Sequence, residues 1–338
     1  MIDALKKMDE LDKKLLIVIE DNKFGGLISA GDIQRGIIQG KPLTINIKDI
    51  IRKNVRIASP EDSFEAIKSM MFEFRMELCP VVNSHNDILN VFFWEDIFQE
   101  IKPQPGMSFN LPVVIMAGGL GSRLKPLTNV LPKPLIPIGN RTMLEEIFER
   151  FQFHGCDHFY VSVNYKADLI EYYINKLNPL FLVEFLKEEK PNGTAGSLSL
   201  LKGKINQTFF VSNCDILIDQ DYSEILDYHR TNSNEITVVA ALKHLAIPYG
   251  TVETGENGQL ISITEKPELT FKINSGMYIL EPQLIDEIHP SIPMDITHLI
   301  EKIKNRGGRV GVFPVSAKSW IDVGSWSEII KHYNLEAR

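Results

Sequence analysis

An apolar strand that runs directly into a glycine-rich turn limits this chain to a small number of folds. Residues 112–116 read Pro-Val-Val-Ile-Met, without the polar alternation of a strand that has one face in water. Strands that are apolar on both faces are typical of parallel sheets covered by helices on both sides. The glycines of residues 117–121 then end the strand in a tight turn. We therefore expect an α/β fold with a mixed, mostly parallel central sheet.

The glycine-rich turn has the chemistry of a phosphate site, because backbone amides without neighbouring side chains approach phosphate oxygens closely. A dinucleotide-binding fingerprint is excluded because Leu124 stands at its third glycine position. A P-loop is excluded because no Gly-Lys-Ser/Thr follows. Arg123 and Lys133 add two cations to the same loop, ten residues apart. The loop and the two cations together predict a site for a triphosphate.

The string Gly-Gly-x-Gly-Ser-Arg-Leu-x-Pro-Leu-Thr, followed by Pro-Lys-Pro-Leu at 132–135, resembles the signature of the sugar-1-phosphate nucleotidylyltransferases. The resemblance implies a Rossmann-like nucleotidyltransferase domain over residues 112–338. It implies that a sugar phosphate oxygen attacks the α-phosphorus of an NTP in line, which forms an NDP-sugar and pyrophosphate without a covalent enzyme intermediate. Arg123 is then expected on the β,γ-phosphates and Lys133 on the α-phosphate. The loop residues implied in nucleotide binding are Ala117, Gly118, Gly119, Gly121, Ser122 and Arg123.

Residues 188–196, Glu-Glu-Lys-Pro-Asn-Gly-Thr-Ala-Gly, resemble the base-binding segment of that family. The resemblance assigns Glu188, Gly193 and Thr194 to the nucleotide. A carboxylate at Glu188 can accept from guanine N1–H and N2–H together, which uracil and thymine do not offer, so GTP is the favoured substrate. The alternative is that Glu188 is a solvated acid at a strand end, since charged residues are mostly exposed.

Two aspartates lie next to apolar residues farther along the chain. Asp215 follows the apolar segment 209–213, and Asp322 lies in Trp-Ile-Asp-Val-Gly at 320–324. The resemblance makes both acids Mg²⁺ ligands, although the family usually has glycine where this chain has Cys214. Two carboxylates from separate strand ends suit Mg²⁺, which takes few protein oxygens besides phosphates and water. Each acid alone would more often be a helix cap or a surface charge. With the two loop cations, they are the expected catalytic residues.

Three later segments resemble the sugar side of the family's site, in the family's order. Gly250, in Pro-Tyr-Gly-Thr-Val, is expected against the sugar ring. Glu265 is expected to accept from sugar hydroxyls, and Lys266 to pair with the sugar phosphate. Asn274, in Asn-Ser-Gly-Met-Tyr, is expected to line the sugar pocket. No one of these segments is distinctive by itself, because Glu-Lys pairs are usually solvated.

The first hundred residues form a separate, repeated block. Lys-Pro-Gln-Pro-Gly at 102–106 predicts an interdomain linker over residues 102–111. Residues 18–32 have the pattern of a strand, a turn, a second strand and the beginning of a helix. The same order recurs over residues 82–96, and in both copies 14 positions separate the first valine from the last aspartate. Before the second repeat, Ser59 and the proline after it predict the start of a helix, with Ala66 on its apolar face.

The repeats resemble a tandem pair of cystathionine-β-synthase-type (CBS) domains over residues 1–101, with the first at about 1–45 and the second at about 46–101. In that family Gly-φ-φ-Ser/Thr-x-x-Asp, where φ is apolar, binds a nucleotide, usually an adenine nucleotide. Ser29 and Asp32 complete this pattern, whereas the second copy keeps only Asp96. The alternative is that the acids cap helices and the pair only mediates dimerisation. CBS pairs tend to associate face to face, so a homodimer or larger homo-oligomer is expected.

A CBS pair ahead of such a domain is similar to the glucosamine-1-phosphate guanylyltransferases of legionaminic acid biosynthesis, a nonulosonic acid route to cell-surface glycans. Glucosamine 1-phosphate is therefore the favoured acceptor, and mannose 1-phosphate is the runner-up. A rival of another class is an inactive nucleotide-sensing protein, which the retained cations and acids disfavour. A Rossmann oxidoreductase is disfavoured by Leu124. Only about fifteen residues follow Asp322, so we expect no acyltransferase or isomerase extension.

Charge and cysteine content restrict the partners of the chain and its location. With 36 Lys+Arg against 44 Asp+Glu, the formal net charge is −8, which excludes a nucleic-acid binder held by bulk charge. No apolar run approaches the length of a membrane span. The three cysteines are odd in number and widely separated, which indicates reduced thiols and a cytoplasmic location.

Overall fold

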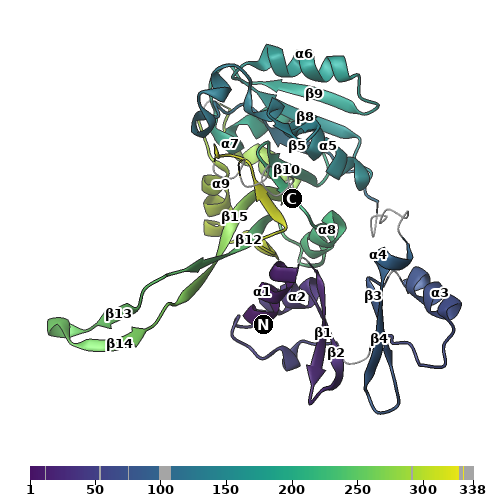
Figure 1. The fold of residues 1–338 in the computed structure, drawn as a ribbon. Helices are drawn as coiled ribbons and strands as arrows, with labels where there is room; N and C mark the ends of the chain where they lie inside the picture. The colour runs from purple at the N-terminus through teal and green to yellow at the C-terminus, as the bar shows by residue number, and fades with distance from the viewer. Residues whose placement is uncertain are drawn as a thin grey trace. The chain divides into compact units, whose positions relative to one another are not determined.

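The structure is a computed structural model that describes residues 1–11, 13–52, 55–74, 76–98, 108–290, 292–326 and 330. The chain divides into two compact units, residues 1–104 and 105–338 (Figure 1). Much of the predicted linker, residues 102–107, lies outside the described residues. Phe109 and Leu111, at the end of that linker, are buried, and the Phe109 amide donates to the His154 carbonyl at 2.8 Å. The second domain therefore begins before residue 112.

The second unit is built on a seven-stranded mixed sheet. Four of its six strand pairings are parallel, and only β15 runs antiparallel to both of its neighbours. The predicted mixed, mostly parallel sheet is confirmed. In order across the sheet, the strands are β16 (Val310–Val315), β12 (Ile236–Ala246), β15 (Glu268–Leu280), β10 (Phe209–Asn213), β5 (Val113–Met116), β8 (His158–Val163) and β9 (Leu182–Lys187).

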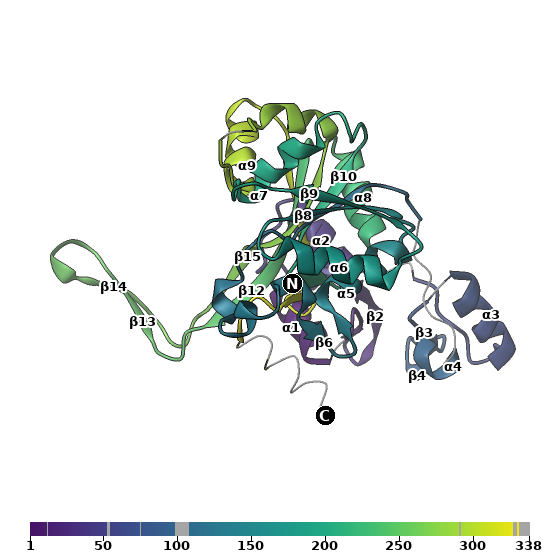
Figure 2. The same cartoon turned by 90° about the horizontal axis from the view of Figure 1, so that it is seen from above.

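Helices cover both faces of this sheet (Figures 1 and 2). On one face, Phe151 of α5 (Met143–Phe153) packs against Phe210 of β10 and Tyr222 of α8 (Tyr222–Thr231). On the other face, α7 (Gly193–Gly196), the 3₁₀ helix η5 (Ser197–Leu201), the 3₁₀ helix η7 (Pro282–Glu287) and α9 (Ile296–Asn305) bury aliphatic side chains against Val114 and Val211. Helix α6 (Ala167–Leu177) joins β8 to β9. The strands in the middle of the sheet are thus apolar on both faces, as their sequences predict.

Shorter elements surround the sheet. Three 3₁₀ helices follow β5: η2 (Ser122–Leu124), η3 (Leu127–Asn129) and η4 (Lys133–Leu135). Three two-stranded ladders pair β6 (Pro137–Ile138) with β7 (Arg141–Thr142), β11 (Ile216–Ile218) with β17 (Trp320–Asp322), and β13 (Thr251–Thr254) with β14 (Leu260–Thr264). The 3₁₀ helix η6 (Glu256–Gly258) joins β13 to β14. Strands β12 and β15 run on beyond the sheet, and β13 and β14 lie at the end of this projection (Figures 1 and 2).

The first unit has the predicted repeat of elements. Helix α1 (Ile2–Leu11), β1 (Leu15–Glu20), β2 (Lys23–Ser29) and α2 (Ala30–Ile38) form the first copy, and the 3₁₀ helix η1 (Ile47–Asp49) follows. Helix α3 (Phe64–Phe74), β3 (Leu78–Val82), β4 (Ile88–Phe93) and α4 (Trp94–Ile97) form the second. The Phe24 amide donates to the Asn86 carbonyl at 2.8 Å, which joins the copies at their strand turns. No helix in the described part of either unit is both long and apolar enough to cross a membrane.

The start of α3 differs from the prediction. Ser59 begins a turn in which its amide donates to the Asp62 carboxylate at 2.7 Å, and the helix begins only at Phe64. Ser63 provides the cap instead, since its hydroxyl accepts from the Ala66 amide at 3.2 Å. Ala66 is exposed rather than on the apolar face.

Candidate active site

The four residues predicted to be catalytic lie close together, beyond the carboxyl ends of β5 and β10 in the central sheet. The Lys133 ammonium pairs with the Asp215 carboxylate, and both side chains are about nine-tenths buried. The Arg123 guanidinium lies 3.5 Å from the same carboxylate, but its side chain is 64% exposed. Asp322 joins them through the ladder between β11 and β17, in which Ile216 pairs with Asp322. The centre therefore contains two cations and two carboxylates.

Side chains of the centre lie on several sides of Gly324. A Cβ atom at Gly324 would lie 2.6 Å from Asp215 Oδ2, 2.7 Å from Asp322 Oδ1 and 3.0 Å from Arg123 Nη2. The Gly324 amide also donates to Asp322 Oδ1 at 2.7 Å. Two carboxylates and a guanidinium thus face one point, which only a residue without a side chain leaves open. Sequence reasoning missed this role, although Gly324 ends the segment that predicted Asp322.

Local backbone contacts hold the acids and the cations together. Asp215 lies just beyond the end of β10, and its carbonyl accepts from the Val323 amide at 3.0 Å. The Trp326 indole N–H donates to the Lys125 carbonyl at 3.0 Å, which ties the segment after β17 to the glycine-rich loop. Cys214, where the family usually has glycine, is buried, and burial raises the pKa of its thiol to about 12. The thiol therefore adds no charge to the centre.

The glycine-rich loop leaves the carboxyl end of β5, where parallel sheets bind ligands. The Ala117 amide donates to the Ser162 carbonyl at 2.9 Å, which anchors the start of the loop. Gly121 has a left-handed φ of 62°, and a Cβ there would lie 2.7 Å from the Thr128 side chain. A Cβ on Gly119 would meet no atom within 4 Å, so the loop is open to solvent there. Ser122 is exposed beside it.

Glu188 lies against the loop. One of its carboxylate oxygens is 3.0 Å from the position of a Cβ on Gly118 and accepts from the Ser162 hydroxyl. The other accepts from the Asn192 amide at 3.1 Å. Glu188 is half-buried and hydrogen-bonded, so it is not the freely solvated acid of the alternative interpretation. The carboxylate is held in one orientation, and each oxygen keeps a further lone pair.

Gly193 and Thr194 have internal roles. A Cβ on Gly193, where φ is 77°, would lie 2.5 Å from the Met294 carbonyl oxygen. The Thr194 hydroxyl accepts from the Ile296 amide at 2.9 Å and so caps the start of α9. Packing and capping therefore account for these residue types without a ligand. Their assignment to the nucleotide stays a prediction.

The predicted sugar-side residues fall into two groups. A Cβ on Gly250 would lie 2.9 Å from the Glu265 carboxylate, so these exposed residues are neighbours, and Lys266 follows in the exposed connection from β14 to β15. Asn274 is also exposed, on β15. Its side chain accepts from the Gly276 amide at 3.1 Å, and a Cβ on Gly276 would lie 2.5 Å from the side chain of Asn213. Asn274 therefore belongs to a segment that lies at the end of β10, just before Asp215.

The acids of the centre fit a magnesium ion. Both carboxylates of Asp215 and Asp322 face the open point at Gly324, and Mg²⁺ prefers carboxylate oxygens. The described part of the chain contains no group of three or more His, Cys, Asp or Glu residues placed to hold a metal. Two protein ligands with the remainder from phosphates and water are the arrangement that Mg²⁺ takes with nucleotides.

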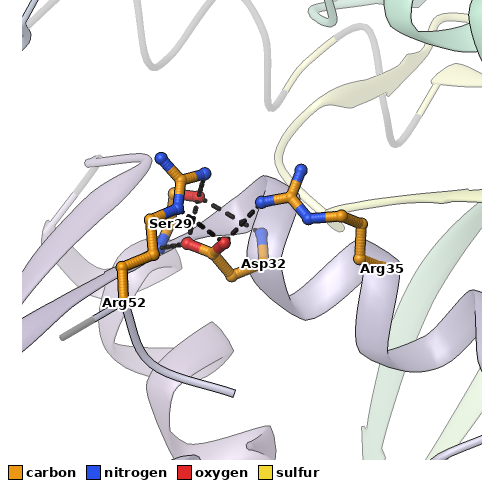
Figure 3. A network of polar contacts seen from close by, with 4 residues as sticks. All are labelled: Ser29, Asp32, Arg35 and Arg52. Atoms are coloured by element: carbon orange, nitrogen blue, oxygen red, sulfur yellow. Dashed lines mark hydrogen bonds and ion pairs between the residues drawn. The ribbon is translucent and has the colours of Figure 1, made fainter. Parts of the chain in front are cut away.

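The predicted nucleotide residues of the first unit form a tight polar network (Figure 3). Asp32 accepts from the Ser29 amide at 2.8 Å and the Ser29 hydroxyl at 2.6 Å, which completes a capping box at the start of α2. The other Asp32 oxygen accepts from Arg52 Nε at 2.7 Å and from the Arg35 guanidinium. Burial by itself would raise the pKa of Asp32, but these hydrogen bonds lower it below its ordinary value. Asp32 thus has a structural role that needs no nucleotide.

The network is absent from the second copy within the described residues. Helix α4 has only four residues, and Phe93 at its N-cap makes no side-chain hydrogen bond. Asp96 is exposed. Because Phe93 replaces the hydroxyl of Ser29, the second copy has no capping box.

Comparisons with known proteins find relatives of this chain among mannose-1-phosphate guanylyltransferases. The chain is 33% identical over 187 residues to mannose-1-phosphate guanylyltransferase catalytic subunit beta of Dictyostelium discoideum, an alignment that covers 53% of this chain and 52% of the relative. It is 30% identical over 223 residues to mannose-1-phosphate guanylyltransferase of Mycobacterium tuberculosis, which covers 64% of this chain and 62% of the relative. The chain thus spans between half and two thirds of these relatives.

A solved structure and a family model each match about two thirds of the chain. The crystal structure of HddC from Yersinia pseudotuberculosis superimposes with a TM-score of 0.53 and 26% identity, over 67% of this chain and 99% of that chain. The family model described as nucleotidyl transferase matches residues 112–337, the sheet and every residue of the centre. This protein belongs to the nucleotidyl transferase family.

Proposed function

We propose that this protein is a sugar-1-phosphate guanylyltransferase, which transfers GMP from GTP to a sugar 1-phosphate and releases pyrophosphate. The observation that carries the proposal is the convergence of Arg123, Lys133, Asp215 and Asp322 around the open point at Gly324. This centre lies beside a glycine-rich loop at the carboxyl ends of β5 and β10. Fixed cations next to a backbone anion site neutralise the charge that a phosphoryl-transfer transition state spreads over its oxygens.

In the proposed reaction, an oxygen of the sugar phosphate attacks the α-phosphorus in line, the bond from the α-phosphorus to the oxygen that bridges it to the β-phosphorus breaks, and pyrophosphate leaves. Arg123 is exposed and has free N–H groups for the β,γ-phosphates. Lys133 is held by Asp215 and would pair with the α-phosphate, and Lys266 would pair with the attacking sugar phosphate. Asp215 and Asp322 would hold Mg²⁺, which when bound neutralises phosphate charge.

The preference for GTP rests on Glu188. Its carboxylate is fixed beside Gly118 by the Ser162 hydroxyl and the Asn192 amide. A guanine base would place N1–H and N2–H against it, whereas the carbonyl oxygens of uracil and thymine would be repelled. The relatives named mannose-1-phosphate guanylyltransferases support this choice, as does a structure of HddC complexed with GMP-PN.

Two acceptors are proposed in order. Glucosamine 1-phosphate comes first, because a CBS-like pair ahead of this catalytic domain is similar to the guanylyltransferases of nonulosonic acid biosynthesis. Mannose 1-phosphate is the second candidate, because the names of the curated relatives favour it.

The test is pyrophosphate release with GTP, ATP, CTP, UTP and dTTP against a panel of sugar 1-phosphates. We expect the highest kcat/KM with GTP and a hexosamine or hexose 1-phosphate, and no exchange of labelled pyrophosphate into GTP without a sugar phosphate. Glu188→Gln should lower kcat/KM for GTP about 10- to 100-fold. The amide NH₂ that replaces one carboxylate oxygen is a donor and cannot accept from a guanine N–H, so one hydrogen bond to the base is lost. Faster turnover with UTP or dTTP would refute the base assignment. Pyrophosphate exchange without acceptor would refute the single displacement.

We also propose that the first unit binds an adenine nucleotide that regulates transfer. Arg35 and Arg52 both pair with Asp32 and have exposed side chains, and Arg52 also donates to the Ser29 hydroxyl at 3.1 Å, so phosphates would bind to these two guanidinium groups. Because Asp32 already accepts four hydrogen bonds, the ribose would have to displace one of them. Calorimetry of the full chain with AMP and ATP tests this proposal. Heat that is lost in Arg52→Ala but kept in Lys48→Ala supports it, and the absence of heat with either nucleotide refutes it.

A further inference from the structure

The projection formed by residues 243–274, called here the arm, has no interior. It contains the outer ends of β12 and β15 and the whole of β13 and β14, and every one of its residues is described. None of those residues is buried. A two-stranded ladder is only marginally stable in water unless one face is covered. The arm therefore consists of regular strands but lacks the packing that would keep such strands ordered.

The inner half of the arm is apolar on one face only. Strand pairing places Leu245 opposite Leu269 and Lys243 opposite Phe271 on one face, since paired residues in an antiparallel ladder share a side. Leu245, Leu269 and Phe271 are 44–53% exposed. The other face is polar. There, His244 is hydrogen-bonded to the Thr270 hydroxyl at 2.8 Å.

The outer half repeats this arrangement. Val252 pairs with Ile263, and Ile261 lies two residues along on the same face. These three side chains are 61–68% exposed. On the opposite face, the Ser262 hydroxyl donates to Glu253 across the ladder at 3.0 Å. Both halves thus alternate apolar and polar residues as a strand does when one face is buried, although no described residue of this domain covers the arm.

We infer that the apolar faces of the two halves of the arm, together called its apolar face, bind the arm of a second copy of this chain. At about 180 Å² for a fully exposed large side chain, the six apolar residues leave roughly 600 Å² exposed per copy. Two copies would bury about 1,200 Å², the lower limit for a stable protein interface. The arm contains three Lys and four Glu, so it has no charge of one sign to repel an identical arm or to attract a nucleic acid or lipid headgroup. A twofold axis would bring identical apolar faces together.

Sedimentation of the full-length protein over a range of concentrations tests this inference. We expect a dimer whose dissociation constant rises at least 30-fold in the double variant Ile261→Thr/Ile263→Thr, which keeps β-branched residues in the strand. The matched control is Glu253→Thr/Ser262→Thr, on the polar face of the same ladder, which should change the dissociation constant less than threefold. A monomeric wild type, or equal effects of the two double variants, would overturn the inference.

Hydrogen exchange separates a second copy from the first unit of the same chain as the occupant of the apolar face. If a second copy covers the arm, the protection of β13 and β14 amides should rise with protein concentration across the dissociation constant. In Ile261→Thr/Ile263→Thr, that dependence should move to higher concentration. Protection that does not change with concentration would mean that the same chain covers its own arm, and would overturn the inference.

Discussion

Replacing Gly324 by alanine tests the geometry of the centre with one methyl group. The φ of Gly324 is outside the left-handed region, so alanine fits the backbone and the effect arises from contacts alone. The new Cβ would lie 2.6 Å and 2.7 Å from the two carboxylates, against an ordinary limit of 3.4 Å, so they must withdraw by about 0.8 Å and about 0.7 Å. Misplacement of catalytic groups by about 1 Å can cost 100-fold in rate. We expect kcat to fall about 10- to 100-fold, with unfolding free energy changed by less than about 1 kcal/mol.

The assay is pyrophosphate release at several Mg²⁺ concentrations, with thermal unfolding measured in parallel. Because the displaced carboxylates are the proposed Mg²⁺ ligands, the Mg²⁺ concentration for half-maximal rate should also rise. Gly31→Ala is the matched control, since its Cβ would meet no atom closer than 3.5 Å. A Gly324→Ala enzyme whose kcat stays within twofold of wild type at all Mg²⁺ concentrations would refute the idea that this centre carries the reaction.

Three further predictions follow from contacts described above. Asp215→Asn and Asp322→Asn should each lower kcat by at least about 100-fold while circular dichroism stays unchanged; turnover near wild type in either one would contradict its role. Thr194→Val should lower the unfolding free energy by about 1 kcal/mol, because the Ile296 amide loses its cap; unchanged stability with a raised KM for GTP would instead favour nucleotide binding. The lowered pKa of Asp32 means that its ion pairs stabilise the fold above its unfolded pKa and are lost as pH falls through the folded value, below about pH 4. Urea unfolding between pH 7 and pH 3 should show this loss, and Asp32→Asn should reduce it; an equal loss in the variant would contradict the prediction.

The sheet and much of the centre could be predicted because their signals are local. The all-apolar run of β5 reports burial on both faces, and the glycine-rich turn after it reports a ligand edge. Arg123 and Lys133 stand in one continuous signature. Asp215 comes directly after a buried strand. In each case, the residues that define the feature are within a few positions of one another.

Other features depend on partners that are distant in sequence. Gly193 is required by the Met294 carbonyl and Thr194 by the Ile296 amide, each about a hundred residues farther along the chain. No local pattern distinguishes these contacts from contacts to a base. At Ser29 and Asp32 one local pattern fits two roles, because a Ser-x-x-Asp string that resembles a nucleotide motif is also a capping box. Only the contacts of the side chains separate the two.

The hydrogen bond between Trp326 and Lys125 also has a consequence for how the protein becomes active as it folds. It joins residues that are 201 positions apart. Closing so long a loop costs conformational entropy, and contacts of this separation slow folding. Arg123 and Lys133 need only the residues up to Asp215, with which both of them pair, to reach their positions. Asp322 is positioned only when β17 has formed. A domain that is still folding would therefore hold the cations that attract a triphosphate without the second acid, so nucleotide consumption would begin only after the two ends of the domain have met.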